Sequence, residues 1–161
     1  MKTAVSHQLR WAQYLHCGID TAWQFFSSPH NLARITPPEM RFSVVSDLPD
    51  SGIYEGMIID YRVSPLFSIP MKWQTEITQV EPYKSFTDYQ KKGPYRLWKH
   101  VHEFLPWDEG VLMKDTVEYE LPFGVLGEVA HRWIVKKKIH HIFDYRCGVL
   151  DNLFNDKKQE T

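Results

Sequence analysis

The clearest candidates for chemistry in this sequence are two histidines separated by one residue, His100 and His102. They lie in the segment 86–104, which alternates polar and apolar residues on both sides of a turn at 91–94 and so predicts two paired strands. Because alternate residues of a strand point to the same face, both imidazoles share a face with aromatic side chains such as Trp98. Histidine exchanges protons near neutral pH, so this row could transfer protons or bind a polar group.

Carboxylates are expected beside the histidines. The same alternation turns Asp88 inward on the first strand of the pair, and it turns Asp115 inward on a later strand at 111–121. Buried polar groups need partners, so these residues either satisfy one another in a hydrogen-bond network or line a cavity that holds water or a ligand. An aspartate beside a histidine could also orient it for general acid or base catalysis.

A metal site is the weaker interpretation of the same residues. Two imidazoles on one strand face lie roughly 6.6 Å apart along the strand, and Asp88 or Asp115 could complete a set of two histidines and one carboxylate. No second acidic cluster accompanies them, so we expect no metal and no cofactor. The sequence also lacks a G-x-S-x-G nucleophile motif and a phosphate-binding glycine loop, and this absence favours a binding function over a catalytic one.

Aromatic residues make up 14% of the chain, and wide, rigid side chains suit both a core and the wall of an apolar pocket. Near the end of the chain, Arg146 is either a solvated charge or a residue that closes the mouth of the pocket. The expected cavity lining comprises Tyr61, Trp73, Asp88, Gln90, Trp98, His100, His102, Asp115, Tyr119 and Trp133.

The surrounding chain predicts a sheet interrupted by two short helices. Alternating patterns bounded by Pro, Gly, Asp or Ser indicate further strands at 5–15, 40–46, 56–63 and 71–80. Between the first two, Asp20 and Pro29 are typical of helix starts. The economical topology is a meander.

A long helix is expected from Gly124 to Phe154, long enough to cross a curved sheet. Residues 1–154 are expected to form one domain, and 155–161 a polar tail. The apolar stripe of this helix comprises Leu126, Val129, Ala130, Trp133, Ile139, Ile142, Phe143, Leu150 and Leu153.

Length and charge limit the function classes. The 161 residues fit a single domain, and a net charge of −1 with a pI of about 6.7 provides no strong field to attract nucleic acid or an anionic membrane surface. The only cysteines, Cys17 and Cys147, are expected to be reduced thiols. Because no apolar run approaches a membrane span and no signal peptide is apparent, we expect a soluble cytoplasmic protein without an integral membrane segment. The sequence carries no signal of oligomeric state.

Four segments carry a resemblance to a known superfamily. They read ITPPEMRF (35–42), MKWQTEITQVEP (71–82), FTDYQKKGPYRLWKHVHEF (86–104) and DTVEYELPFGVLG (115–127). In this order they resemble a bacterial branch of the SRPBCC superfamily, which includes START lipid-transfer domains, birch-pollen-type allergens and polyketide cyclases. Members of the branch occur alone or fused to an epimerase-like domain labelled a cell-division inhibitor.

The resemblance implies an α+β helix-grip fold, in which a curved seven-stranded antiparallel sheet surrounds a long C-terminal helix. The first functional hypothesis is non-catalytic binding of a hydrophobic or amphipathic small molecule, similar to a lipid, polyketide or isoprenoid. The alternative is a cofactor-free cyclase or dehydratase in which His100 or His102 is the general acid or base and Asp88 or Asp115 orients it. A third class, an interaction module derived from the fused proteins, would require an exposed apolar patch, and the sequence shows none.

Overall fold

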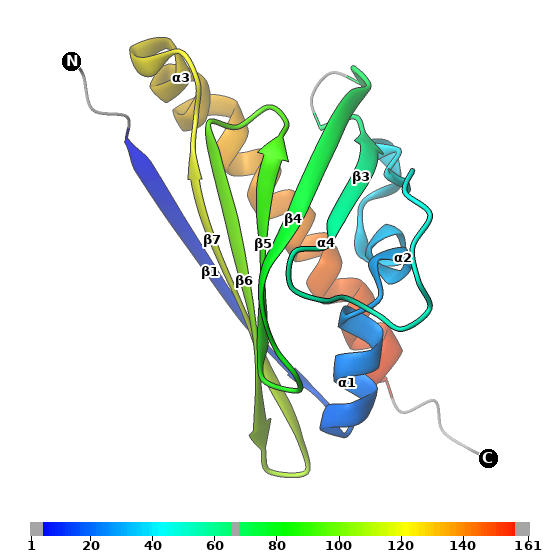
Figure 1. The fold of residues 1–161 in the computed structure, drawn as a ribbon. Helices are drawn as coiled ribbons and strands as arrows, with labels where there is room; N and C mark the ends of the chain where they lie inside the picture. The colour runs from blue at the N-terminus through cyan, green and yellow to red at the C-terminus, as the bar shows by residue number, and fades with distance from the viewer. Residues whose placement is uncertain (1–4, 66–67, 157–161) are drawn as a thin grey trace.

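The computed structural model describes residues 5–65 and 68–156, and it contains one sheet curved around a C-terminal helical segment (Figure 1). The seven antiparallel strands lie in the order β1-β7-β6-β5-β4-β3-β2, so the last six form the expected meander and β1 joins at the β7 edge. The expected α+β fold class is confirmed. The strands are β1 (Ser6–Leu15), β2 (Ser43–Val44), β3 (Ile58–Val63), β4 (Met71–Glu81), β5 (Ser85–Lys92), β6 (Leu97–Trp107) and β7 (Gly110–Glu120).

Short helices connect β1 to β2, as predicted. Ala22 of the first helix is fully buried, and the ring of Trp23 packs edge-on against Phe104 of the sheet. These helices lie beside the end of the C-terminal helical segment (Figure 1), where the ring of Phe25 packs edge-on against Phe154. They are α1 (Ile19–Phe26), α2 (Pro29–Leu32), η1 (Ala33–Ile35) and η2 (Pro38–Met40).

The strand predicted at 40–46 is much shorter in the structure. Pro38 begins a 3₁₀ turn, and Arg41 adopts a left-handed conformation with φ of 47°, so the chain becomes extended only afterwards. As the edge strand, β2 pairs through Ser43 and Val44 alone. The alternating sequence pattern includes Met40 and Arg41, but these residues lie in and directly after the 3₁₀ turn and are not extended, so the predicted strand was too long.

The β5–β6 turn is held by a side chain that was expected to face the cavity. The amide of Gln90 donates to the carbonyl of Tyr95 at 2.7 Å and accepts from the Tyr95 N–H at 3.3 Å. A Cβ added to Gly93 would lie 2.3 Å from the Gln90 Oε1, so a residue with a side chain would push this amide away. Gln90 therefore fixes the hairpin that carries the histidines.

The C-terminal helical segment is divided by a π turn. It comprises α3 (Gly124–Ala130), the π turn η3 (His131–Val135) and α4 (Lys136–Phe154). In α4, the buried residues Ile139, Phe143, Arg146 and Leu150 form a single stripe against the sheet. At the end of α4, Asn155 donates to the Tyr14 carbonyl and accepts from the His16 N–H, which anchors the helix to the end of β1.

The apolar stripe was wrongly predicted to continue through the first half of the helix. Leu126, Val129 and Trp133 are exposed. A π turn holds one more residue than an α turn, so it rotates the side-chain positions of α3 relative to those of α4. Of the expected tail 155–161, the structure describes only Asn155 and Asp156, and the remaining positions lie outside the described residues.

Candidate ligand-binding site

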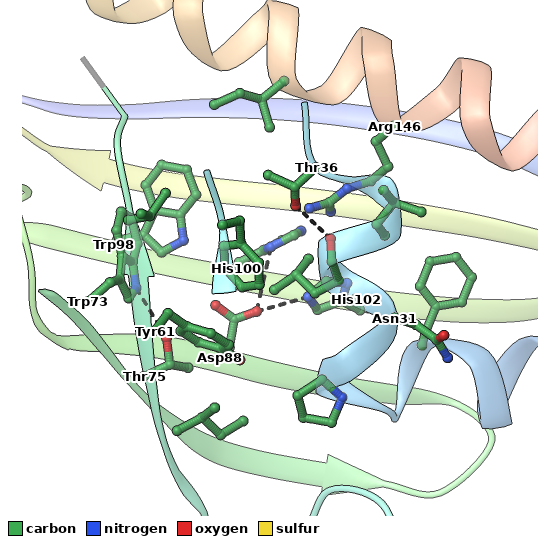
Figure 2. A pocket seen from close by; sticks show the side chains of 18 of the residues that line it. Asn31, Thr36, Tyr61, Trp73, Thr75, Asp88, Trp98, His100, His102 and Arg146 are labelled. Carbon is green, nitrogen blue, oxygen red and sulfur yellow. Dashed lines mark hydrogen bonds and ion pairs between the residues drawn. The ribbon is translucent and has the colours of Figure 1, made fainter. Parts of the chain in front are cut away.

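A cavity of about 160 Å³ lies between the sheet, the short helices and α4. Its lining is mainly apolar and aromatic, with contributions from α1, the chain around η1, strands β3 to β6, and the middle of α4. Figure 2 shows the polar side chains of β5 and β6 gathered on one wall, with Arg146 reaching toward them from α4. The cavity is therefore apolar over most of its surface and polar in one place.

Two histidines and two aspartates form that polar wall. Asp115 Oδ1 lies 2.7 Å from His100 Nε2 and 3.1 Å from His102 Nδ1. Asp88 Oδ2 lies 2.9 Å from His102 Nε2 and 3.5 Å from His100 Nδ1. The ring centroids of the two imidazoles are 3.7 Å apart, because the rings tilt toward each other. Two residues that are two positions apart on a strand are separated by roughly 6.6 Å along it. We call these four residues the buried histidine cluster.

The register of three neighbouring strands produces this cluster. Asp88 of β5 pairs with His100 of β6, and His102 pairs with Asp115 of β7, so carboxylates and imidazoles alternate across the sheet. Phe86 stacks on the His102 ring with a centroid distance of 4.1 Å. Both imidazoles are therefore fixed in position by strand pairing and by an aromatic neighbour.

Burial and charge act in opposite directions on the aspartates. Burial alone would raise the pKa of Asp88, but the neighbouring His100 imidazole, the hydrogen bond and charge of His102 and the charge of Arg146 lower it below its ordinary value. Burial likewise opposes ionisation of Asp115, and hydrogen bonds from both histidines lower its pKa far below the usual range. Both carboxyl groups are therefore ionised at neutral pH.

The pKa values of the two imidazoles are shifted in opposite directions. Burial and the neighbouring charge of His102 lower the pKa of His100, in spite of the aspartates. Burial also opposes the charged form of His102, but hydrogen bonds to Asp115 and Asp88 outweigh it and raise the pKa. The 3.5 Å separation at His100 Nδ1 is too long for a hydrogen bond, so we assign a neutral His100 that donates through Nε2, and the carboxylates 2.9 Å and 3.1 Å from the two nitrogens of His102 favour its cationic form.

Arg146 is the cation on the helix side of the cavity. It is only 6% exposed, and its guanidinium lies 4.6 Å from the centroid of the Phe143 ring. The Arg146 Nη1 is 4.0 Å from Asp115 Oδ1, which is too far for a hydrogen bond. Within the described residues, Nε and Nη1 have no hydrogen-bond partner. Of the two interpretations of Arg146 from the sequence, a solvated charge is therefore wrong.

The structure brings most of the predicted lining together. Tyr61, Trp73, Asp88, Trp98, His100 and His102 contact the cavity. Tyr61 comes from β3, and both burial and the charge of Asp88 raise its hydroxyl pKa. Trp73 donates through its indole N–H to Thr75, which also lines the cavity.

Four predicted residues do not line the cavity. Asp115 lies behind the imidazoles, and Gln90 is bonded to the β5–β6 turn. Tyr119 is fully buried, and its hydroxyl is 2.8 Å from His131 Nε2. Trp133 is 66% exposed, because the π turn directs it away from the sheet. Alternation in a strand identifies the inward face, but it does not distinguish the cavity surface from the layer behind it.

Sequence reasoning missed several lining residues. Tyr95 follows the β5–β6 turn, and its ring packs 4.8 Å from Trp98 between centroids. Phe25 and Phe26 of α1 also reach the cavity, although the sequence pattern indicated only a packed helix face. The sequence does carry a signal for Arg146, because it lies at helical spacing from Phe143 and Leu150 and so places a cation within the buried stripe.

A second pair of histidines lies near the start of β1. The rings of His7 and His131 stack with a centroid distance of 3.6 Å. His7 Nε2 is 3.1 Å from Glu128 Oε2, and all three side chains are partly exposed. Together with the Tyr119 hydroxyl on His131, these residues form what we call the boundary histidine cluster.

Ligand atoms of either histidine pair and one carboxylate lie within 4.8 Å of one another, close enough to share a metal ion. In the buried histidine cluster, His100 Nε2 and His102 Nε2 are hydrogen-bonded to aspartates, so those nitrogens already have partners. The proximity is explained by the hydrogen-bond network, and we assign no metal there.

Comparisons with known proteins identify the architecture. No family model matches the chain, and no curated protein matches it. Ms6760 from Mycobacterium smegmatis is similar in structure, with 17% identity over 91% of this chain and 89% of the other, and a TM-score of 0.63. Major latex-like protein 151 from Panax ginseng has 13% identity over 94% and 99%, and a TM-score of 0.67.

A norcoclaurine synthase from Thalictrum flavum is also similar, with 13% identity over 95% of this chain and 99% of the other and a TM-score of 0.65. The chain has the helix-grip fold of Bet v 1-like, SRPBCC-type proteins. Within residues 5–65 and 68–156, none of the helices combines the length and apolar character needed to span a bilayer. At these identities the likeness establishes the fold.

Proposed function

We propose that the protein binds a hydrophobic or amphipathic small molecule, similar to a lipid, polyketide or isoprenoid, in the cavity between the sheet and α4, and releases it unchanged. The observation that carries the proposal is the cavity itself, with an apolar lining and one polar wall. Such a combination is typical of small-molecule sites, where apolar surface provides affinity and a few polar groups fix orientation. The helix-grip fold is consistent with this use.

The proposal is tested by binding of an apolar fluorescent dye and by native mass spectrometry of protein purified from several hosts. We expect saturable dye binding and a co-purified small molecule. Ile142→Trp would fill the cavity from α4, whereas Ile134→Trp makes the same change on an exposed part of the helical segment. Ile142→Trp should weaken dye binding about tenfold or more, and Ile134→Trp should leave it within about twofold.

Absence of saturable binding by every dye, together with no bound molecule in any preparation, would contradict the proposal. Equal loss in both tryptophan variants would also contradict it, because the dye would then bind outside the cavity. Circular dichroism of both variants separates loss of the site from loss of the fold.

A second candidate function is acid–base catalysis of the cyclase or dehydratase type. The observation that favours it is that His100 and His102 both contact the cavity while each is hydrogen-bonded to an aspartate. A general base must lie within hydrogen-bond reach of the proton it removes, and an orienting carboxylate strengthens it. The similar norcoclaurine synthase is an enzyme by name, with a structure in complex with a transition-state analogue.

Proton exchange would reveal this activity. In deuterated water, exchange of the methylene protons of pentane-2,4-dione can be followed by NMR with and without protein. Catalysis predicts acceleration that falls about a hundredfold in His100→Gln or His102→Gln. Rates that equal those of the buffer would leave only the binding function.

A further inference from the structure

A buried cation with unused donors faces the cavity. Arg146 lines it, and two of its guanidinium nitrogens have no partner among the residues that the structure describes. A buried charged donor without an acceptor is strongly unfavourable, and almost all buried polar groups in native proteins are paired. Guanidinium groups match carboxylates especially well because they offer parallel N–H donors. The position therefore fits an acidic group of the ligand.

The charges around the guanidinium limit how such a group can enter. With Asp88 and Asp115 ionised, the positive charges of Arg146 and His102 balance them, and a neutral His100 adds nothing. An incoming carboxylate would leave one uncompensated negative charge in a low-dielectric interior, which is costly. Binding of the anion must therefore be accompanied by the uptake of one proton by the protein.

We propose that the cavity binds a small carboxylic acid as its anion, with the carboxylate on Arg146 and one proton taken up at His100 Nδ1. This inference rests on the proposed binding function and names the ligand class. The protonated His100 would then donate to Asp88 from Nδ1, in place of the present 3.5 Å separation. No covalent bond forms or breaks, and the proton comes from solvent.

Groups from every element packed around His100 bear on this proton. Burial and His102 of β6 oppose it, whereas Asp88 of β5 and Asp115 of β7 favour it. Arg146 of α4, 4.0 Å from Asp115, is a like charge that also disfavours a cationic imidazole. The Tyr61 hydroxyl of β3 stays neutral because its pKa is raised. A ligand carboxylate on the α4 side offsets the charge of Arg146 and therefore favours protonation of His100.

The cavity volume limits the apolar part of the ligand. About 160 Å³ is close to the volume of an engineered apolar cavity that holds one benzene ring. The aromatic walls provided by Trp73, Tyr95 and Trp98 suit a flat apolar group. An aryl or short alkyl carboxylic acid is therefore the expected class.

Calorimetry with two matched probes tests the inference. 4-Phenylbutyrate and 4-phenylbutan-1-ol have the same apolar body, and only the first carries a carboxylate. We expect the acid to bind about tenfold or more tightly, with uptake of one proton, measured from the difference in heat between phosphate and Tris buffers. The affinity for the acid should fall as the pH rises above neutrality, and the affinity for the alcohol should not.

Arg146→Met should weaken binding of 4-phenylbutyrate about tenfold or more while leaving the alcohol within about twofold. Arg132→Met makes the same substitution at an exposed position of the helical segment and should change neither affinity. Since Arg146→Met could unfold the protein, Arg146→Lys provides a charge-retaining variant that should keep the proton uptake. Equal affinity for acid and alcohol without proton uptake would overturn the acid assignment and leave the cavity proposal standing. Dye binding without binding of either probe would overturn the ligand class, and failure of dye and probes together would overturn both.

A different part of the molecule supports a second, independent inference. Four large apolar side chains around α3 are between 56% and 82% exposed, and we call them the α3 patch: Phe123, Leu126, Val129 and Trp133. Clustered exposed apolar side chains on a helical segment usually mark an interaction site. The α3 patch lies at the end of the sheet farthest from α1 (Figure 1).

The α3 patch is bordered by positive charge. Arg132, Lys136 and Lys137 are exposed, and among the described residues none of them has an acidic partner within 4 Å. The nearest acidic residue in the sequence of this segment, Glu128, is paired with His7. The net charge of −1 for the whole chain therefore conceals a local basic region.

We infer that the α3 patch docks onto an anionic phospholipid surface. Apolar side chains with a tryptophan at their border, flanked by lysine and arginine, are the combination found in helices that lie in a membrane interface. Four side chains are too few for a stable dimer, which needs about 20–30 residues from each partner. The charge of the border selects an anionic surface.

Flotation with vesicles of phosphatidylcholine, with or without phosphatidylglycerol, tests this inference. We expect binding to the anionic vesicles, with weaker binding as the salt concentration rises. Leu126→Glu and Trp133→Glu should each reduce the bound fraction several-fold, because a carboxylate would have to enter the interface.

Trp107→Glu is the matched control. Trp107 is 64% exposed and ends β6, and the β6–β7 turn lies at the opposite end of the sheet from α3 (Figure 1). Equal loss in Trp107→Glu and Trp133→Glu would overturn the inference, because attachment would then be non-specific. Lack of flotation would overturn it as well. A concentration-dependent dimer that Trp133→Glu abolishes would show that a second copy covers the α3 patch instead.

Discussion

The buried and the boundary histidine clusters are built from the same residue types in different surroundings. Each contains two imidazoles with ring centroids 3.6 to 3.7 Å apart, and each contains a carboxylate within hydrogen-bond distance. In the buried histidine cluster, His100 and His102 are at most 6% exposed and meet two aspartates. In the boundary histidine cluster, His7 and His131 are partly exposed and meet one glutamate.

Burial decides what these residues can do. Water competes with Glu128 for His7, so the contact between them contributes little to stability. The side chains of Asp88 and Asp115 in the buried histidine cluster are only 18% and 9% exposed, so water competes less there, and the two carboxylates favour the protonated form of His102 and position both rings. The comparison predicts that equivalent substitutions will have large effects in the interior and small ones at the boundary.

The largest effect is expected from Asp115→Ala. This substitution removes the hydrogen-bond acceptor of His100 Nε2 and the carboxylate 3.1 Å from His102 Nδ1, and it leaves Asp88 as the only carboxylate beside both imidazoles and Arg146. Breaking a buried charged network typically costs about 3–5 kcal/mol. Urea unfolding at neutral pH measures the change, with Glu118→Ala on an outward position of β7 as the control. A loss below about 1 kcal/mol would mean that the network does not stabilise the fold.

The next largest effect, and the most dependent on pH, is expected from His102→Asn. The folded-state pKa of His102 is raised, so its contribution is fully present below the unfolded value of about 6.5 and is lost as the pH rises through the folded value. We expect a destabilisation of about 1–3 kcal/mol near pH 6 that becomes smaller in alkaline solution. Unfolding curves of both proteins over this range measure the difference. A difference that grows with pH would contradict the assigned cation.

A smaller effect is expected from Tyr119→Phe. Tyr119 lies between the buried interior and the boundary histidine cluster. The Tyr119 side chain is fully buried, while its hydroxyl contacts the partly exposed His131, and burial raises its pKa to about 12. Loss of one neutral hydrogen bond should cost about 0.5–1.5 kcal/mol, because water can reach His131 instead. Thermal unfolding provides the measurement. A loss as large as that of Asp115→Ala would show that the boundary histidine cluster is not open to water.

The smallest effect is expected from His7→Ala. It removes the hydrogen bond with Glu128 and the stacked ring on His131, both of which are partly exposed. Exposed pairs are worth about 0.2–1 kcal/mol, so the free energy of unfolding should change within that range. The variant is compared with His102→Asn at the same pH. Equal losses in the two variants would remove the distinction between the two clusters.

The sequence by itself determined the strands, their inward faces and therefore the main members of the polar wall. A period of two in β3, β6 and β7, interrupted by charges that must face water, is sufficient to place His100, His102 and Asp115 on the inner face. The same reasoning placed the short helices, since Pro29 and the residues around Asp20 have strong local preferences. These features depend on interactions between residues close in the chain.

Only the tertiary structure decided which inward residues meet the cavity. Strand alternation shows which side chains point inward, but whether an inward side chain reaches the cavity depends on the strand register and on the residues that pack over it. For this reason Asp88 lines the cavity and Asp115 lies behind the imidazoles. The π turn likewise altered the helical period and exposed Trp133, whereas Arg146 became buried against Phe143. These outcomes depend on contacts between segments distant in sequence, and a local period carries no information about the distance or angle at which such segments meet.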